Sequence, residues 1–228
     1  MSASTSWRAI IDGRLWEAER LSGAGFPLRT VALELPGGGT CVVSPTRGID
    51  PAPLVERAGD VRYLLAPNHF HYMGIAPWME KCPRALPVCG PVARPRLTKK
   101  VEVPWTDLEE LAAALPDDAS LLQPEGTRNG EVWLRVGSTW VVCDAFFNLP
   151  VMPSGALGMF CRLTSMAPGL KIGGTWKYLA LKDRTKYAAW IERTLEQHPP
   201  DRLVASHGAI AEGADLADQI RALVRARL

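Results

Sequence analysis

Two β-hairpins, one in each half of the chain, most constrain how it can fold. Residues 30–35 and 40–44 are rich in strand-forming side chains and flank a proline and three glycines, a pattern that predicts two paired strands. Residues 131–136 and 139–143 repeat this pattern around a glycine-serine turn. Because each half supplies its own pair of strands, we expect two sheets.

Further strands and helices are interleaved with the hairpins. Short apolar runs that end at Pro or Gly predict strands, and apolar residues at helical spacing predict helices. The strands are expected at residues 61–66, 86–89, from 121 onwards and at 203–206, and the helices at residues 50–59, 107–114, 183–197 and around Leu216 to Val224. Since strands and helices do not alternate regularly, we expect an α/β fold with two mixed sheets packed together, helices outside them, and one domain over residues 1–228.

The composition excludes several kinds of partner. The chain has 228 residues, of which 47% are hydrophobic and 22% charged, and its net charge is only +2, so no general attraction to nucleic acid or to an anionic membrane is expected. The basic cluster of Arg94, Arg96, Lys99 and Lys100 has no aromatic residues interleaved with it, which is typical of a solvated surface. We therefore expect a small-molecule substrate or ligand, and leave a homo-oligomer open.

The expected compartment is the cytoplasm. Residues 1–14 are polar and lack the apolar core of a signal peptide, and no apolar run in the sequence is long enough to cross a bilayer. The five cysteines form an odd set without a Cys-x-x-Cys pair, a pattern typical of reduced thiols in a reducing compartment. Neither a disulfide nor a zinc finger is expected.

Ionisable side chains follow three of the predicted strands at the point where each strand ends. His69 and His71 follow the first of these strands, Asp144 the second and His207 the third. Because loops at the carboxyl ends of strands collect side chains from distant parts of a sequence, we expect the four residues to converge. Imidazole and carboxylate groups bind zinc, iron and manganese, and two histidines separated by one residue face the same way in an extended segment. Each residue alone also suits a surface, turn or loop role, so the prediction of a metal site depends on the joint pattern.

Three segments resemble the metallo-β-lactamase superfamily. Residues 66–74, Ala-Pro-Asn-His-Phe-His-Tyr-Met-Gly, are similar to its His-x-His-x-Asp-His motif, and residues 140–147, Trp-Val-Val-Cys-Asp-Ala-Phe-Phe, to the strand that ends in its metal-bridging aspartate. Residues 205–208, Ala-Ser-His-Gly, resemble its final histidine segment. The closer resemblance is to an uncharacterised branch with Ala-Pro-Asn before the histidines, a tryptophan shortly after them (Trp78) and Ser-His-Gly near the end. The resemblance covers nearly the whole chain and implies a four-layer αββα sandwich.

The departures from the superfamily motif fall on its metal ligands. Met73 and Gly74 stand where the motif has aspartate and histidine, so the second metal position loses two ligands. Residues 123–130 match the segment that supplies another histidine; Thr127 or a neighbour replaces it, and Glu125 is a speculative substitute. The resemblance therefore implies a reduced, mononuclear site. The ligands that remain are His69, His71, Asp144 and His207.

This ligand set predicts a metal-dependent hydrolase. One ion with three or four such ligands and an open position lowers the pKa of bound water to about 7 and polarises a carbonyl or phosphoryl group. We expect zinc, with iron or manganese as alternatives, and Asp144 as the catalytic proton acceptor. The competing interpretation is that no metal binds and that the chain is an inactive binding or scaffolding protein. A two-iron redox site is disfavoured because too few ligands remain.

Residues 152–178 form the least regular part of the sequence. They include Met159, Phe160, Met166 and Trp176 among glycines and prolines, which is too apolar for an ordinary solvated loop and too irregular for a regular element. We expect this segment to cover the mouth of the site or to line a subunit contact.

Overall fold

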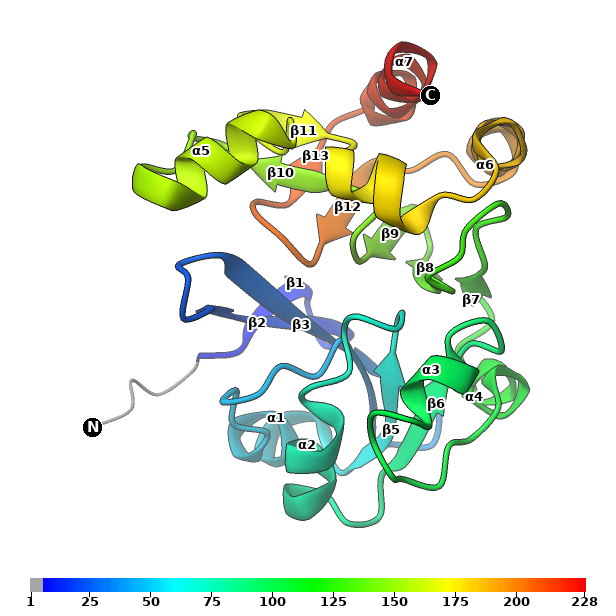
Figure 1. Cartoon of the computed structure of the whole chain (residues 1–228). Coiled ribbons are helices and arrows are strands. Elements are labelled where there is room, and N and C mark those ends of the chain that lie inside the picture. Colours follow the sequence, from blue (N-terminus) through cyan, green and yellow to red (C-terminus); the bar gives the residue numbers. More distant parts are fainter. Residues whose placement is uncertain (1–5) are drawn as a thin grey trace.

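The computed structural model describes residues 6–228 and has four layers (Figure 1). Two β-sheets face each other at the centre, and helices cover the outer face of each sheet. The strands of the first sheet are β1 (Arg8–Ile11), β2 (Leu15–Leu21), β3 (Pro27–Glu34), β4 (Thr40–Val43), β5 (Val61–Ala66) and β6 (Leu86–Cys89). Those of the second sheet are β7 (Ala119–Leu122), β8 (Trp133–Val136), β9 (Thr139–Val142), β12 (Arg202–Ala205) and β13 (Ala211–Glu212).

A separate two-stranded pair and eight helical segments complete the fold. The pair consists of β10 (Phe147–Leu149) and β11 (Gly169–Lys171). The helices described within residues 6–228 are α1 (Ala52–Ala58), α2 (Ile75–Lys81), α3 (Arg94–Leu97), α4 (Leu108–Ala114), α5 (Gly155–Leu163), the π-helical turn η1 (Trp176–Ala180), α6 (Arg184–Gln197) and α7 (Leu216–Arg227). In Figure 1, α1 and α2 lie below the first sheet, and α6 and α7 lie above the second.

Both sheets are mixed, as the sequence predicts. The first sheet follows chain order from β1 to β6, with β1 to β4 antiparallel and β4 to β6 parallel. The second has the order β13-β12-β9-β8-β7, in which β12 pairs with β9 in parallel. Because β9 and β12 are parallel neighbours, their carboxyl ends lie at the same edge of the sheet.

Alternating side chains place each strand between two apolar layers. In β5, Tyr63 and Leu65 belong to the core between the sheets, whereas Leu64 belongs to the core under α1 and α2. In β9, Val141 faces the core between the sheets and Trp140 faces the core under α6 and α7. This period of two is the reason why the buried strands are apolar throughout their length.

The strands predicted from these apolar runs are largely confirmed. β5 and β6 have the predicted bounds, and β12 and α6 lie within one residue of theirs. The strand predicted from residue 121 onwards is misplaced, because β7 ends at Leu122, which pairs with Trp133 of β8. The sequence reading did not identify β1 or β2, which extend the first sheet at its edge.

The prediction that residues 152–178 contain no regular element is wrong. The segment contains α5, β11 and η1. Glycine lowers helix propensity, and the glycines of α5 are the reason why the sequence did not predict this helix. In the fold, a Cβ atom at Gly158 would lie 1.9 Å from the carbonyl oxygen of Pro153, so a glycine is needed where the helix contacts the turn before it.

Two further predictions concern the chain as a whole. No helix within residues 6–228 is long and apolar enough to cross a membrane. The apolar core between the sheets contains residues from both halves of the chain, and one domain over residues 1–228 stays a prediction. Residues 1–5, which belong to that domain prediction and to the predicted polar N-terminal stretch, lie outside the described residues.

Candidate metal centre

Three strand ends bring His71, Asp144 and His207 together. Asp144 and His207 come shortly after the parallel neighbours β9 and β12, and His71 lies in the loop after β5 of the other sheet. The backbone N–H of Arg29 in β3 donates to the carbonyl of Ser206, and the buried guanidinium of Arg29 donates to the carbonyl of Ala205. β3 of the first sheet thus fixes the start of the loop that carries His207.

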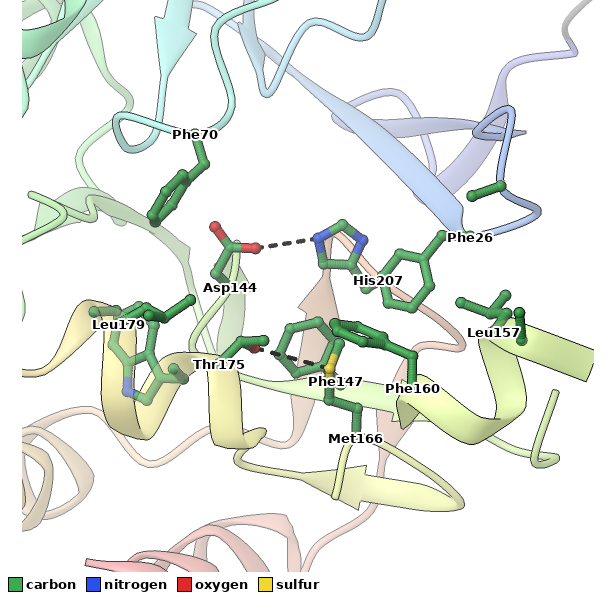
Figure 2. A pocket seen from close by; sticks show the side chains of 14 residues that line it. Phe26, Phe70, Asp144, Phe147, Leu157, Phe160, Met166, Thr175, Leu179 and His207 are labelled. Atoms are coloured by element: carbon green, nitrogen blue, oxygen red, sulfur yellow. Dashed lines mark hydrogen bonds and ion pairs between the residues drawn. The ribbon is translucent and has the colours of Figure 1, made fainter. Parts of the chain in front are cut away.

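The two imidazoles converge on one carboxylate oxygen. Nε2 of His71 lies 3.4 Å from Oδ1 of Asp144, and Nε2 of His207 lies 3.2 Å from the same oxygen. One nitrogen or oxygen atom from each of the three residues lies within 4.8 Å of the other two. Figure 2 shows the carboxylate of Asp144 directed towards the ring of His207. This arrangement supplies two nitrogen donors and one oxygen donor at a single point.

The outer nitrogen of each imidazole has a partner that holds the ring. Nδ1 of His207 lies 2.8 Å from the carbonyl oxygen of Pro27, and because a carbonyl only accepts, Nδ1 must carry the proton. Nε2 of the same ring faces Oδ1 of Asp144. Nδ1 of His71 lies 2.9 Å from the hydroxyl of Ser44, a residue with φ of 54°. Such outer partners are typical of histidines that bind metals.

A buried network holds Asp144 from below. Nδ2 of Asn68 donates to Oδ2 of Asp144 at 2.7 Å and to Glu131 at 3.1 Å. Glu131 in turn accepts hydrogen bonds from the backbone N–H groups of Cys143, Asp144 and Ala145 and from the indole of Trp133. The carboxylate of Asp144 therefore has a fixed position, with Oδ1 left for the imidazoles.

The charges of the group favour its ionised forms. Burial alone would raise the pKa of Asp144, but the imidazoles of His71 and His207 hold it well below its usual range. Burial alone would lower the pKa of His71, but the negative charge of Asp144 and the contact with it outweigh burial, so that the pKa is raised. A cation at this point is therefore stabilised by the carboxylate.

The structure places His69 apart from this group. Its ring lies against Phe70, with ring centroids 4.2 Å apart, and Nε2 lies 3.4 Å from a guanidinium nitrogen of Arg96. Burial, and next the positive charge of Arg96, lower the pKa of His69. The expectation of an extended segment is wrong, because residues 68–74 form bends and turns. Oδ1 of Asn68 accepts from the backbone N–H groups of Phe70 and His71, and this turn gives the two histidines different surroundings.

The two residues considered as replacements for the missing histidine also lie elsewhere. Glu125 is exposed and forms an ion pair with Arg193 of α6 at 2.6 Å. The hydroxyl of Thr127 donates to the carbonyl of Pro124, and its backbone bridges to Leu181. Glu125 does not belong to the group around Asp144, and the Thr127 hydroxyl is directed at Pro124.

The structure shows the surroundings of the two positions at which the sequence departs from the superfamily motif. The side chain of Met73 is 69% exposed. A Cβ atom at Gly74 would lie 1.8 Å from the carbonyl oxygen of Pro45. A histidine therefore has no room at position 74, and the side chain at position 73 projects into solvent.

A second potential ligand group lies beneath the first. Atoms of Glu131, Cys143 and Asp144 lie within 4.8 Å of one another. Burial raises the pKa of Cys143 well above its ordinary value, and both oxygens of Glu131 already accept N–H donors. This group is therefore structural.

An apolar cavity of about 670 Å³ opens beside Asp144 and His207 (Figure 2). The aromatic residues Phe26 and Phe147 line it and contact the ring of His207, Phe147 in a stacked arrangement. α5 and η1 contribute Phe160 and Trp176. The expectation that residues 152–178 lie over the site is thus met for α5 and η1.

Sequence reasoning missed the residues that hold the ligands, namely Arg29, Ser44, Asn68 and Glu131. Asn68 and Glu131 each had a local signal: Asn68 directly precedes the histidine segment, and Glu131 is a carboxylate at the start of an apolar hairpin. A buried carboxylate is rare unless it is paired or hydrogen-bonded, so Glu131 could have been singled out. Arg29 and Ser44 carried no comparable signal, because their partners are distant in sequence.

The chain is similar in fold to solved metallo-β-lactamases over nearly its whole length, which confirms the predicted αββα sandwich. A metallo-β-lactamase from Pontibacter korlensis has a TM-score of 0.63 at 10% identity, over 97% of this chain and 99% of its own. The metallo-β-lactamase FIM-1 from Pseudomonas aeruginosa, in a mono-zinc form, has a TM-score of 0.60 at 12% identity, over 99% of this chain and 96% of its own. Comparisons with protein-family models and with curated protein sequences found no match.

Proposed function

We propose that this protein is a metal-dependent hydrolase with a mononuclear site formed by His71, Asp144 and His207. The observation that carries the proposal is the convergence of two imidazole nitrogens on one oxygen of Asp144. Two histidines and one carboxylate form a known ligand set for catalytic zinc and for non-haem iron. The metallo-β-lactamase fold supports the reaction class, since its solved examples include a mono-zinc enzyme.

The distances fit an ion better than they fit hydrogen bonds. A tetrahedral ion with bonds of about 2.0–2.1 Å holds its ligand atoms about 3.3 Å apart. The two nitrogen-to-Oδ1 distances are 3.4 and 3.2 Å, whereas a typical N–H···O bond is about 2.9–3.0 Å long. Three protein ligands would leave the fourth position open towards the cavity that Asp144 and His207 line.

The reaction itself needs little covalent chemistry from the protein. Hydrolysis joins the oxygen of water to a carbonyl carbon or a phosphorus atom, breaks the bond to the leaving group, and gives the leaving group one proton. A bound ion would polarise the reacting centre and lower the pKa of the water. The low pKa of Asp144 makes it a weak base, so we propose it first as a ligand. Its role as catalytic proton acceptor stays a prediction.

The first test is the metal content of the purified protein. We expect about one equivalent of zinc, iron or manganese in the wild-type protein by elemental analysis. His71→Ala and His207→Ala are each expected to weaken metal affinity by at least about 100-fold, since losing a group that only orients a ligand already costs about 10- to 100-fold. Circular dichroism checks that each variant is folded.

The other two histidines serve as matched controls. His198 is the C-cap residue of α6 and lies outside the group of His71, Asp144 and His207. The His198→Ala variant is therefore expected to keep the metal. His69→Ala is expected to keep it too, because His69 contacts Arg96 instead of Asp144. A folded wild-type protein that takes up none of the three metals when they are added would contradict the hydrolase proposal. The remaining interpretation would be a metal-free binding protein.

A further inference from the structure

Two cavities of different chemistry meet at the proposed metal centre. The first is the apolar cavity of about 670 Å³, in which only Asp144, His207 and Thr175 are polar. Its volume lies within the range of about 300–1,000 Å³ that is typical of small-molecule sites. The second cavity, of about 490 Å³, is lined by His71 and by polar residues of the loops after β2 and β4. Each cavity thus contains part of the same three-residue group.

The walls of the two cavities are continuous. Phe70 lines both. The loop between β2 and β3 contributes Gly23 to the second cavity and Ala24 to the first. Since His71 lines one cavity and Asp144 and His207 line the other, the three-residue group lies where the two cavities approach each other.

The apolar cavity is built for a carbon chain or ring. Its floor includes Phe147 and Met166, and α5 supplies Leu157 and Phe160. Phe160 remains 46% exposed although it is a large apolar side chain. A phenylalanine that lines an open cavity gains the stabilisation of burial only when a ligand covers it.

The second cavity is positively charged. Arg20 and Arg47 line it, and none of its lining residues is an aspartate or glutamate. Within residues 6–228, no ion pair joins either arginine to a carboxylate. The guanidinium of Arg20 donates to the backbone carbonyls of Leu21 and Arg47, which leaves its positive charge uncompensated. Arginine is the side chain that best recognises carboxylate and phosphate groups.

We propose that the site binds an anionic amphiphile, with its apolar chain in the first cavity and its anionic group beside Arg20 and Arg47. This inference extends the proposed function, because it places a hydrolysable ester or amide bond of such a molecule at Asp144, between the two cavities. The substrate class would then be an acyl compound whose leaving group carries a carboxylate or phosphate.

Binding can be tested without activity by isothermal titration calorimetry on protein stripped of metal with a chelator. The probe is N-decanoylglycine, which has an apolar chain, an amide and a carboxylate in this order. N-decanoylglycinamide differs only in lacking the charge. We expect the carboxylate to bind at least fivefold more tightly than the amide, and each methylene added from hexanoyl to decanoyl to tighten binding by about fourfold.

Variants with matched controls test which part of the probe each cavity binds. Phe160→Asp should weaken both probes at least tenfold, whereas Met159→Asp, on the same helix but outside the lining, should leave binding unchanged. Arg47→Ala should remove the preference for the carboxylate, and Lys99→Ala, which removes the same charge elsewhere, should preserve it. Binding that Phe160→Asp does not affect, or the absence of binding, would overturn the proposal; equal affinity for the two probes would overturn its anionic part. Because no metal is present, these results are independent of the metal-content test.

Discussion

Glu131→Gln is expected to lower the free energy of unfolding by about 1–3 kcal/mol, the cost of leaving buried N–H donors without an acceptor. Both carboxylate oxygens of Glu131 act only as acceptors. Oε1 accepts from the backbone N–H groups of Cys143 and Ala145 and from the indole of Trp133, and Oε2 accepts from the backbone of Asp144 and from Asn68. A glutamine has nearly the same shape, but its NH₂ group would face N–H donors and leave them unsatisfied.

The hydrogen bonds of Glu131, and not its charge, set this cost. Burial, and next the negative charge of Asp144, raise the pKa of Glu131 to about 7, whereas its N–H donors stabilise the carboxylate. The residue therefore holds the chain from Cys143 to Ala145 at a considerable desolvation cost. Urea unfolding followed by tryptophan fluorescence measures the change. The metal content of Glu131→Gln should also fall, because the network positions Asp144.

Glu125→Gln is the matched control for Glu131→Gln. Glu125 makes one exposed ion pair with Arg193, and such pairs contribute at most about 1 kcal/mol. We expect the control to unfold within about 1 kcal/mol of the wild-type protein. A loss below about 1 kcal/mol for Glu131→Gln would show that Glu131 does not hold this loop.

Gly74→His, which restores the histidine of the superfamily motif, is expected to destabilise the protein by about 3 kcal/mol or more and to add no second metal. The Cβ position at Gly74 lies 1.8 Å from the carbonyl oxygen of Pro45 and 3.0 Å from the backbone nitrogen of Arg47. Backbone atoms cannot yield as a flexible side chain can, so the loops after β4 and β5 must separate. Thermal unfolding and elemental analysis together test this expectation.

Met73→Asp restores the other missing ligand and is the control for Gly74→His. Because Met73 is 69% exposed, the substitution should change stability by no more than about 0.5 kcal/mol. It should also leave the metal content at one equivalent, since the new carboxylate would project into solvent. Two equivalents of metal in either variant would show that the second position persists in this chain.

The elements that the sequence predicted well are those whose pattern is local. β5, β9 and β12 are short, almost continuous apolar runs that end at Pro67, Asp144 and His207 or just before them, and such runs identify buried strands without knowledge of their partners. The sequence did not predict α5, because the glycines of this helix lower its helix propensity. The helix is stable in the fold because Gly158 lets it approach Pro153, a contact that no local pattern records.

The sequence by itself determined the central buried strands, the mixed sheets and the presence of histidines and an aspartate at strand ends, because apolar runs and chain order can be recognised from neighbouring residues alone. Only the tertiary structure decided which of these side chains meet. Asn68 turns the segment after β5 so that His71 reaches Asp144 while His69 reaches Arg96. Glu131 and Pro27 then fix Asp144 and His207 from distant parts of the chain. The direction of a side chain in a loop depends on such hydrogen bonds, whose partners are known only once the sheets have packed.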